Sequence, residues 1–199
     1  MQILQKRIQE EGIVLPGNVL KVDAFLNHQI DPLLCMEMGR AFARLFSDVS
    51  VDRVLTVEAS GIAIGVSTAY ALQVPLVFAK KKKSMLMEEA AYTAPVYSYT
   101  KKETNTISVL KKFLPRGEEV LVVDDFLANG EASLGLAALV EAAGSRVAGI
   151  GIAVDKAFQQ GHDRILSRGY RLESLAVIDS LDGGTVTFRR SGEQEKEAL

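Results

Sequence analysis

Two adjacent acids, Asp124 and Asp125, stand directly after the apolar run at residues 120–123 and before a short turn that contains Gly130. Neighbouring carboxylates repel each other unless they meet hydroxyl donors or a cation. The turn exposes backbone N–H groups at the start of an expected helix, which favours binding of a phosphate. Carboxylates for sugar hydroxyls beside amides for a phosphate describe a site for ribose 5-phosphate. The same spacing also fits a solvated strand end followed by an ordinary helix cap.

Hydrophobic patterning predicts the elements that must position these acids. Strands are expected at residues 54–57, 75–78, 119–123 and 146–154, and helices at residues 62–72 and 132–143. The strands at 119–123 and 146–154 show no apolar–polar alternation, which indicates burial on both faces. Two strand–helix–strand units predict an α/β fold with an open, mainly parallel, twisted sheet flanked by helices. Ligands bind such sheets beyond the carboxyl ends of the strands, so the loops after residues 57, 78, 123 and 154 are the candidate site.

The N-terminal part predicts smaller elements ahead of this sheet. Residues 2–11 are expected to form a helix that ends at Gly12. Residues 13–22 are expected to be extended and to turn at Pro16–Gly17, a pair suited to a type II turn. Asp31 is the expected N-cap of an amphipathic helix that begins at Pro32 and whose apolar positions include Leu33.

Length and composition predict one domain over residues 1–199, with a frayed tail at 191–199. Apolar residues make up 48% of the chain and the net charge is -2, so no basic field favours nucleic acid or a membrane surface. No apolar run reaches the roughly 20 residues of a membrane span. Cys35 is the single cysteine, which excludes an internal disulfide framework and favours a reducing, cytoplasmic location. Two distant histidines, with His162 expected on a helix surface, make no zinc site.

Residues 80–106 interrupt the pattern. They open with four lysines, continue with polar and aromatic residues that include Tyr97 and Tyr99, and show no clear period. A stretch of this length is usually a lid or a disordered insertion. The lysines by themselves are most simply read as a solvated face.

The acids and the turn after them resemble the purine phosphoribosyltransferases, which have the type I fold of the purine and pyrimidine phosphoribosyltransferase family. Ala128 stands where the hypoxanthine–guanine enzymes usually carry an acid, so the turn is similar to that of the adenine and xanthine branch. The resemblance implies transfer of the phosphoribosyl group of 5-phosphoribosyl 1-diphosphate (PRPP) to a purine, with Asp124 and Asp125 holding the ribose hydroxyls. It implies that the 5'-phosphate is wrapped by Ala128, Asn129, Gly130, Glu131 and Ala132. Threonines that are common in this turn are replaced, so the backbone amides and Ser133 must supply more of the grip.

The resemblance also assigns the remaining PRPP contacts. Small residues after the strand at 54–57 let backbone amides approach an anion, and in the family the positions of Ala59, Ser60 and Gly61 receive pyrophosphate. Lys81 is expected to neutralise the leaving group, and residues 82–106 to form a mobile lid that excludes water. Mg²⁺ is expected, held mainly through PRPP and pyrophosphate, with no protein metal site. A homodimer is implied as well.

The choice of base depends on two regions. Lys156 follows a buried strand, and its ammonium group has only donors, which suits a 6-oxopurine and opposes adenine. Residues 20–32, LKVDAFLNHQIDP, are similar to a stretch shared by family members specific for xanthine, in which the backbone at Leu20 and the amide of Asn27 contact the base. Together with residues 1–20 this stretch is expected to form a hood over the base, at about residues 1–35. Phe158 is either a stacking partner or ordinary core packing.

Three alternatives remain open. Guanine or hypoxanthine would also satisfy Lys156, and Asn27 does not exclude guanine. A non-catalytic, PRPP-sensing regulator would use the same fold, but the chain has little room for a DNA-binding domain. A different nucleotide-binding α/β protein lacks support, because neither GxxxxGK[ST] nor GxGxxG occurs.

Overall fold

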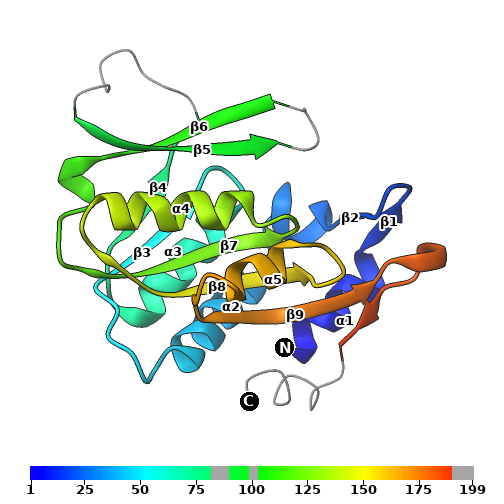
Figure 1. Ribbon diagram of the computed structural model, residues 1–199. Coiled ribbons are helices and arrows are strands. Elements are labelled where there is room, and N and C mark those ends of the chain that lie inside the picture. The colour runs from blue at the N-terminus through cyan, green and yellow to red at the C-terminus, as the bar shows by residue number, and fades with distance from the viewer. Residues whose placement is uncertain (82–89, 99–102, 190–199) are drawn as a thin grey trace.

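The computed structural model describes residues 1–81, 90–98 and 103–189 (Figure 1). The helices and helical turns are α1 (Gln2–Glu11), η1 (Asp23–Asn27, a π-helical turn), α2 (Pro32–Leu45), α3 (Gly61–Leu72), η3 (Lys111–Phe113), α4 (Glu131–Ala142), α5 (Gly161–Leu166) and η4 (Asp182–Gly184). The strands are β1 (Ile13–Leu15), β2 (Val19–Lys21), β3 (Arg53–Val57), β4 (Leu76–Ala79), β5 (Ala91–Ser98), β6 (Glu103–Leu110), β7 (Glu119–Leu127), β8 (Arg146–Lys156), β9 (Leu172–Ser180) and β10 (Thr187–Phe188). Within the described ranges, no helix is long and apolar enough to cross a membrane.

A six-stranded sheet in the order β10-β9-β8-β7-β3-β4 forms the centre of the fold. The strands β4, β3, β7, β8 and β9 are parallel, and only β10 at one edge runs antiparallel to its neighbour. The predicted open, mainly parallel sheet with flanking helices is therefore confirmed, with β3–α3–β4 and β7–α4–β8 as its strand–helix–strand units. The carboxyl ends of the parallel strands lie along one edge, where ligands of such sheets bind.

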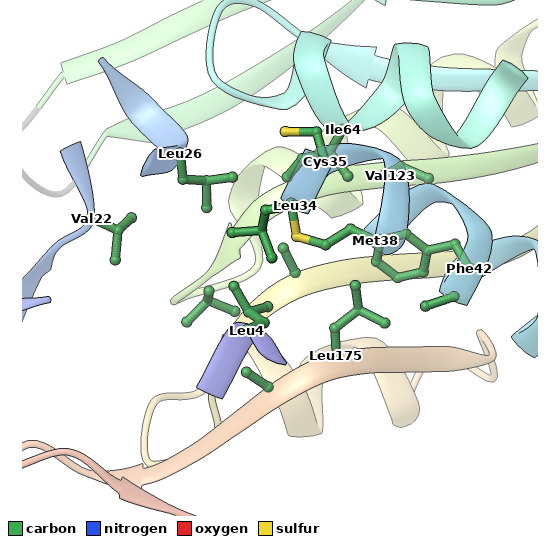
Figure 2. Packing of buried hydrophobic residues seen from close by; sticks show 14 of the residues in the cluster. Leu4, Val22, Leu26, Leu34, Cys35, Met38, Phe42, Ile64, Val123 and Leu175 are labelled. Atoms are coloured by element: carbon green, nitrogen blue, oxygen red, sulfur yellow. The ribbon is translucent and has the colours of Figure 1, made fainter. Parts of the chain in front are cut away.

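Buried side chains pack against both faces of the sheet. Leu121 and Val123 of β7 belong to a core shared with α1, α2 and α3, whereas Val120 and Val122 face a second core shared with α4, β5 and β6. Figure 2 shows part of the first core, where Met38 of α2 lies among apolar side chains from several elements. Burial on both faces explains why these strands show no apolar–polar alternation.

Two glycines of β8 allow α2 to lie close to the sheet. A Cβ atom at Gly149 would lie 2.3 Å from Cε1 of Phe46, and one at Gly151 would lie 2.9 Å from Cδ1 of Phe42. Both phenylalanine rings are fully buried. Their aromatic area is thus packed directly on the β8 backbone, where a larger residue would push the helix away.

The N-terminal elements agree with the sequence predictions at most positions. Helix α1 has the predicted bounds, β1 and β2 pair antiparallel around Gly17 at φ +80°, and the Asp31 side chain accepts hydrogen bonds from the first N–H groups of α2. Leu33, in contrast, is 78% exposed, so the buried face of α2 begins at Leu34. That residues 1–35 act as a hood over a base stays a prediction.

Two strands are longer than the sequence predicted. β7 continues to Leu127 and β8 to Lys156, so Asp124, Asp125 and Lys156 lie inside strands and not in the loops after residues 123 and 154. Backbone pairing continues past the apolar runs: Asp124 pairs with Ile152, and Lys156 pairs with Ile178 of β9. The sequence prediction ended each strand too early because polar residues follow the apolar run, although backbone pairing continues through them.

The expectation of an irregular segment at residues 82–106 is wrong for residues 91–98 and 103–106. They belong to the antiparallel hairpin of β5 and β6, which lies on α4 (Figure 1). Ala94 and Ile107 are buried there, and a Cβ atom at Gly135 of α4 would lie 2.6 Å from Cγ2 of Val96. The small Ala94 and the proline beside it obscured the strand pattern. Residues 82–89, residues 99–102 with Tyr99, and the tail from residue 190 lie outside the described residues.

Substitution of Gly39 by alanine should destabilise the protein. Its Cβ would lie 2.4 Å from the carbonyl carbon and oxygen of Ser67, so α2 and α3 would have to move apart. We expect a loss of about 1–3 kcal/mol in the free energy of unfolding, measured by urea denaturation. Leu33→Ala, on the exposed side of the same helix, is the control and should change it by less than about 0.5 kcal/mol. Equal stability of Gly39→Ala and the native chain would contradict this packing.

Candidate active site

The acid pair lies near the carboxyl end of β7, the middle one of the five parallel strands. Asp124 is 4% exposed and Asp125 is 7% exposed, and the Asp125 N–H donates to Asp124 Oδ1 at 3.0 Å. Burial, followed by the charge of Asp125, raises the pKa of Asp124 well above its usual value, and the charge of Lys81 partly opposes this rise. Two carboxylates held in this way favour a partner that brings hydroxyl donors or positive charge.

The turn between β3 and α3 brings a helix N-terminus to the first of these acids. A Cβ atom at Gly61 would lie 2.1 Å from Thr56 Oγ1 and 2.8 Å from Asp124 Oδ1, so only glycine fits there. Thr56 is fully buried, and its hydroxyl has no hydrogen-bond partner among the described residues. The turn itself contains a cis peptide bond between Glu58 and Ala59. The backbone N–H groups at this end of α3 favour an anion beside Asp124.

Glu58 joins this turn to the end of β4. Its Oε1 accepts a hydrogen bond from the Lys81 N–H at 2.7 Å, and its own N–H donates to the Ala79 carbonyl at 3.0 Å. Lys80 exchanges two backbone hydrogen bonds with Ser108 of β6, at 2.9 and 3.0 Å. The loops after β3 and β4 are therefore held together. The exposed Lys81 side chain lies near enough to lower the pKa of Asp124.

The turn between β7 and α4 is packed tightly against the start of α5. Gly130 has φ +81°, which favours glycine, and it precedes the first residue of α4. The Gly161 N–H donates to the Ala128 carbonyl at 2.9 Å. A Cβ atom at Gly161 would lie 2.5 Å from the Ala128 oxygen and 2.7 Å from the Gly130 nitrogen. The shape of the turn thus depends on close backbone contact with α5.

Arg164 of α5 holds the outer part of the same turn. Its Nη1 donates to the Asn129 carbonyl and to Glu131 Oε1, each at 2.5 Å. The Glu131 carboxylate is therefore paired with a guanidinium group. Ser133, the third residue of α4, is buried, and its hydroxyl has no partner among the described residues.

Lys156, the last residue of β8, connects the sheet to the β1–β2 hairpin. Its Nζ donates to the Asn18 carbonyl at 3.1 Å and lies 5.5 Å from the centroid of the Phe126 ring. Burial lowers the pKa of Lys156. Leu20 of β2 has a buried side chain and lies opposite Val14 of β1, whereas Asn27 is exposed at the end of η1.

The comparisons with known proteins agree with this geometry. The model of the phosphoribosyl transferase domain matches residues 27–179, a range that contains the acid pair, both glycine-lined turns and Lys156. This chain belongs to the phosphoribosyltransferase family. Members of the family bind PRPP, which carries a ribose, a phosphate and a pyrophosphate.

Similar sequences include phosphoribosyltransferases named for xanthine. One from Lactobacillus delbrueckii subsp. bulgaricus is 58% identical over 94% of this chain and 100% of its own length. One from Ligilactobacillus salivarius is 55% identical over 94% of this chain and 98% of its own length. One from Bacillus cytotoxicus is 54% identical over 94% of this chain and 95% of its own length.

Similar solved structures include adenine phosphoribosyltransferases. The enzyme from Thermoanaerobacter pseudethanolicus is 25% identical, covers 74% of this chain and 81% of its own, and has a TM-score of 0.65. The enzyme from Trypanosoma brucei, solved with AMP, pyrophosphate and ribose-5-phosphate, is 17% identical, covers 98% of this chain and 92% of its own, and has a TM-score of 0.71. At such low identity, the second likeness shows the shared fold alone.

The predicted site residues fall into two groups in this phosphoribosyltransferase. Asp124, Gly61 and Lys81 come together at the ends of β7, β3 and β4, and Asp125 is hydrogen-bonded to Asp124. Lys156 lies with the N-terminal hairpin that holds Leu20. The exposed Asn27 belongs to the turn that follows this hairpin, away from any described contact with the acid pair.

Sequence reasoning missed a buried histidine–aspartate pair behind the site. His162 was expected on a helix surface, but its side chain is 14% exposed and its Nδ1 lies 2.6 Å from Oδ2 of the fully buried Asp155. Ser174 of β9 donates to the same Oδ2 at 3.1 Å. The hydrogen bond to Asp155 raises the pKa of His162. Asp155 directly follows the apolar residues of β8. An acid that continues a buried strand needs a partner, and this was the signal in the sequence that could have revealed the pair.

Replacement of Asp124 by asparagine should make the protein more stable than the native chain, by an amount that grows as pH rises. The folded-state pKa of Asp124 is raised above the ordinary value of 3.8, so its contribution favours folding at low pH and is lost as pH increases toward the folded pKa. Each unit of this rise corresponds to about 1.4 kcal/mol. The stability of Asp124→Asn relative to the native chain should therefore increase between about pH 4 and pH 8 in urea denaturation. The exposed Asp182→Asn is the control, and a pH-independent difference for Asp124→Asn would contradict the burial of a charged pair.

Proposed function

We propose that this protein transfers the 5-phosphoribosyl group of PRPP to N9 of xanthine, forming xanthosine 5'-monophosphate and pyrophosphate. The observation that carries the reaction is the buried acid pair between two glycine-lined turns, each at a helix N-terminus. Relatives that are 54–58% identical over 94% of the chain are named for xanthine, which supports xanthine as the base. The enzyme would thus serve purine salvage.

The proposed PRPP site uses the carboxyl edge of the sheet. Asp124 and Asp125 accept hydrogen bonds from the ribose hydroxyls, which offsets the repulsion between two buried carboxylates. The 5'-phosphate lies against the backbone amides of residues 128–132, with the buried hydroxyl of Ser133 beside them. Pyrophosphate lies at the turn of Ser60 and Gly61, and Lys81 neutralises the charge that develops on it. The Thr56 hydroxyl next to Gly61 has no partner among the described residues, which supports a polar ligand at this point.

Xanthine would lie between Lys156 and the N-terminal elements. The Lys156 ammonium group donates to the C6 oxygen, the Leu20 backbone contacts the ring, and the Asn27 amide donates to the C2 oxygen. The hydrogen bond from Lys156 to Asn18 supports this arrangement, because it brings the donor and the hairpin to one place. Lys156 by itself accepts guanine and hypoxanthine equally well. Phe158 is partly buried against the hydrophobic core, which favours core packing of its ring over stacking on the base.

The chemistry requires positioning and neutralisation of charge more than a strong base. Ala128 leaves no carboxylate at the position where some family members carry one. The side chains and amides of the site would therefore act by aligning the two substrates and excluding water. Mg²⁺ prefers few protein ligands together with phosphate oxygens, so it would be held mainly through PRPP and its pyrophosphate, with Asp124 and Asp125 on the ribose hydroxyls beside it. When bound with PRPP, Mg²⁺ would stabilise negative charge on the pyrophosphate. As xanthine N9 bonds to C1', the bond from C1' to the pyrophosphate oxygen breaks, and the proton that xanthine loses passes to solvent.

The proposal includes the architecture around the site. Residues 1–199 form one domain, with residues 1–35 as the hood and residues 82–106 as a lid that covers the reacting carbon. A homodimer is supported by an apolar groove of about 350 Å³ along the edge strand β4, lined in part by Phe78, Val109 and Phe113. The single cysteine, Cys35, supports a cytoplasmic location.

The function is tested by incubating the protein with PRPP, Mg²⁺ and each purine in turn. We expect xanthine to give the largest kcat/KM, with guanine and hypoxanthine lower and adenine without product. Asp124→Asn and Asp125→Asn should each raise the KM for PRPP or lower kcat by at least about tenfold, since both remove a charged acceptor. A larger kcat/KM for guanine than for xanthine would show that guanine is the preferred base and would refute xanthine. Native kinetics in both variants would refute the ribose site.

Replacement of Lys156 by methionine should act on the base and not on PRPP. The variant keeps most of the side-chain volume but removes the donor to the C6 oxygen, so the KM for xanthine should rise by about tenfold or more. The KM for PRPP should change little. Lys6→Met, at an exposed position of α1, is the matched control. An unchanged KM for xanthine would exclude Lys156 as the residue that recognises C6.

A further inference from the structure

Helix α5 makes three contacts with the turn between β7 and α4. The Gly161 N–H bonds to the turn's backbone, and Arg164 donates both to the turn's backbone and to the Glu131 carboxylate. We propose that Arg164 is a positioning residue for PRPP, which holds the turn in shape and neutralises Glu131 so that the turn accepts a phosphate. The inference rests on the proposed function, because it assigns the 5'-phosphate to residues 128–132. It adds a residue that makes no contact with the substrate.

The first part of the argument is electrostatic. Glu131 is the first residue of α4, at the helix end whose backbone N–H groups favour an anion. An unpaired carboxylate at that point would repel a phosphate with close to two negative charges. Arg164 Nη1 lies 2.5 Å from Glu131 Oε1, and the two side chains are only partly exposed, so solvent does not fully screen the pair. The guanidinium group therefore cancels a charge that would weaken binding of PRPP.

The second part is geometric. The same Nη1 donates to the Asn129 carbonyl, so one guanidinium group fixes both the backbone and the carboxylate of the turn. The carbonyl of Asn129 is thereby directed toward α5, which leaves the neighbouring amides free to face a ligand. A Cβ atom at Gly161 would lie 2.5 Å from the Ala128 oxygen, and one at Gly130 would lie 3.2 Å from the Gly161 Cα atom, so the turn and α5 are in close backbone contact.

The third part is the anchoring of α5 itself. His162, two residues before Arg164, pairs with Asp155 of β8, and Asp155 also accepts a hydrogen bond from Ser174 of β9. Ile165, the residue after Arg164, is fully buried in the core under α4. These contacts fix a short helix on two strands of the sheet. The position of Arg164 is thus set by the sheet and not by the turn that it holds.

The experiment measures four variants: Arg164→Ala, Arg164→Lys, Glu131→Gln and the double variant Arg164→Ala/Glu131→Gln. For each, the KM values for PRPP and xanthine, kcat, and the Kd for ribose 5-phosphate by calorimetry are determined, together with the melting temperature. Arg168→Ala is the matched control, because it removes an exposed arginine just after the same helix and changes the net charge by the same amount.

We expect Arg164→Ala to raise the KM for PRPP and the Kd for ribose 5-phosphate by about tenfold, since it leaves a carboxylate without its partner. The KM for xanthine and the kcat should stay within about twofold. Addition of Glu131→Gln to Arg164→Ala should recover a large part of the loss, because it removes the repelling charge. Arg164→Lys should recover part of it. Glu131→Gln alone should lower the KM for PRPP, because it leaves the positive charge of Arg164 unopposed near the phosphate.

The rescue separates this inference from a purely structural role. If Arg164 only supported the fold, Glu131→Gln would not repair its loss, and the KM for xanthine would change together with that for PRPP. Either result, or an Arg164→Ala variant as active as Arg168→Ala, overturns the inference while the native protein still makes product. If Arg164→Ala does not fold, a raised or unchanged KM for PRPP in Glu131→Gln overturns it and a lowered one supports it. A native protein that neither binds ribose 5-phosphate nor uses PRPP overturns the proposed function and this inference together.

Discussion

The burial of two adjacent carboxylates at the end of a strand is the constraint on which the rest of this structure depends. Asp124 has lost nearly all contact with water and lies beside a second acid, so its charged form is disfavoured. The surroundings reduce this cost without removing it: the start of α3 faces the pair, and Lys81 contributes positive charge. Such an arrangement stores free energy that a ligand with hydroxyl groups and a bound cation can release. The site is thus unfavourable for the empty protein and favourable for a charged sugar phosphate.

Backbone atoms, more than side chains, form the rest of the site. Gly61, Gly130 and Gly161 each stand where a Cβ atom would meet another part of the chain, so the two turns approach the acid pair as bare peptide. A site made of amides tolerates substitution of its side chains as long as the turn keeps its shape. This explains how the turn at residues 128–132 accommodates Glu131, whose charge is offset by Arg164 from outside the turn.

The sequence predicted those parts of the fold that depend on residues close to one another in the chain. The parallel sheet followed from doubly buried strands such as residues 120–123, and the N-cap at Asp31 followed from an acid before a proline. The strand ends were missed because backbone pairing between neighbouring strands continues after the apolar residues stop, as at Asp124 and Ile152. The pairing of Asp155 with His162 was missed because it depends on where α5 packs, which local pattern does not encode. The hairpin of β5 and β6 was missed because its burial comes from α4, which is remote in sequence.

Recognition of PRPP and recognition of the base are assigned by the proposed function to different parts of the chain. The acid pair and the turns belong to the sheet, whereas Leu20 and Asn27 belong to a hairpin and a π-helical turn attached to its edge. Lys156 joins the two, because it is part of β8 and donates to the hairpin at Asn18. A lysine can distinguish an oxygen from an amine at C6, but it cannot distinguish xanthine from guanine, which differ at C2. Discrimination at C2 must therefore come from the attached segment, and that segment can change between relatives without disturbing the buried acids that bind the sugar.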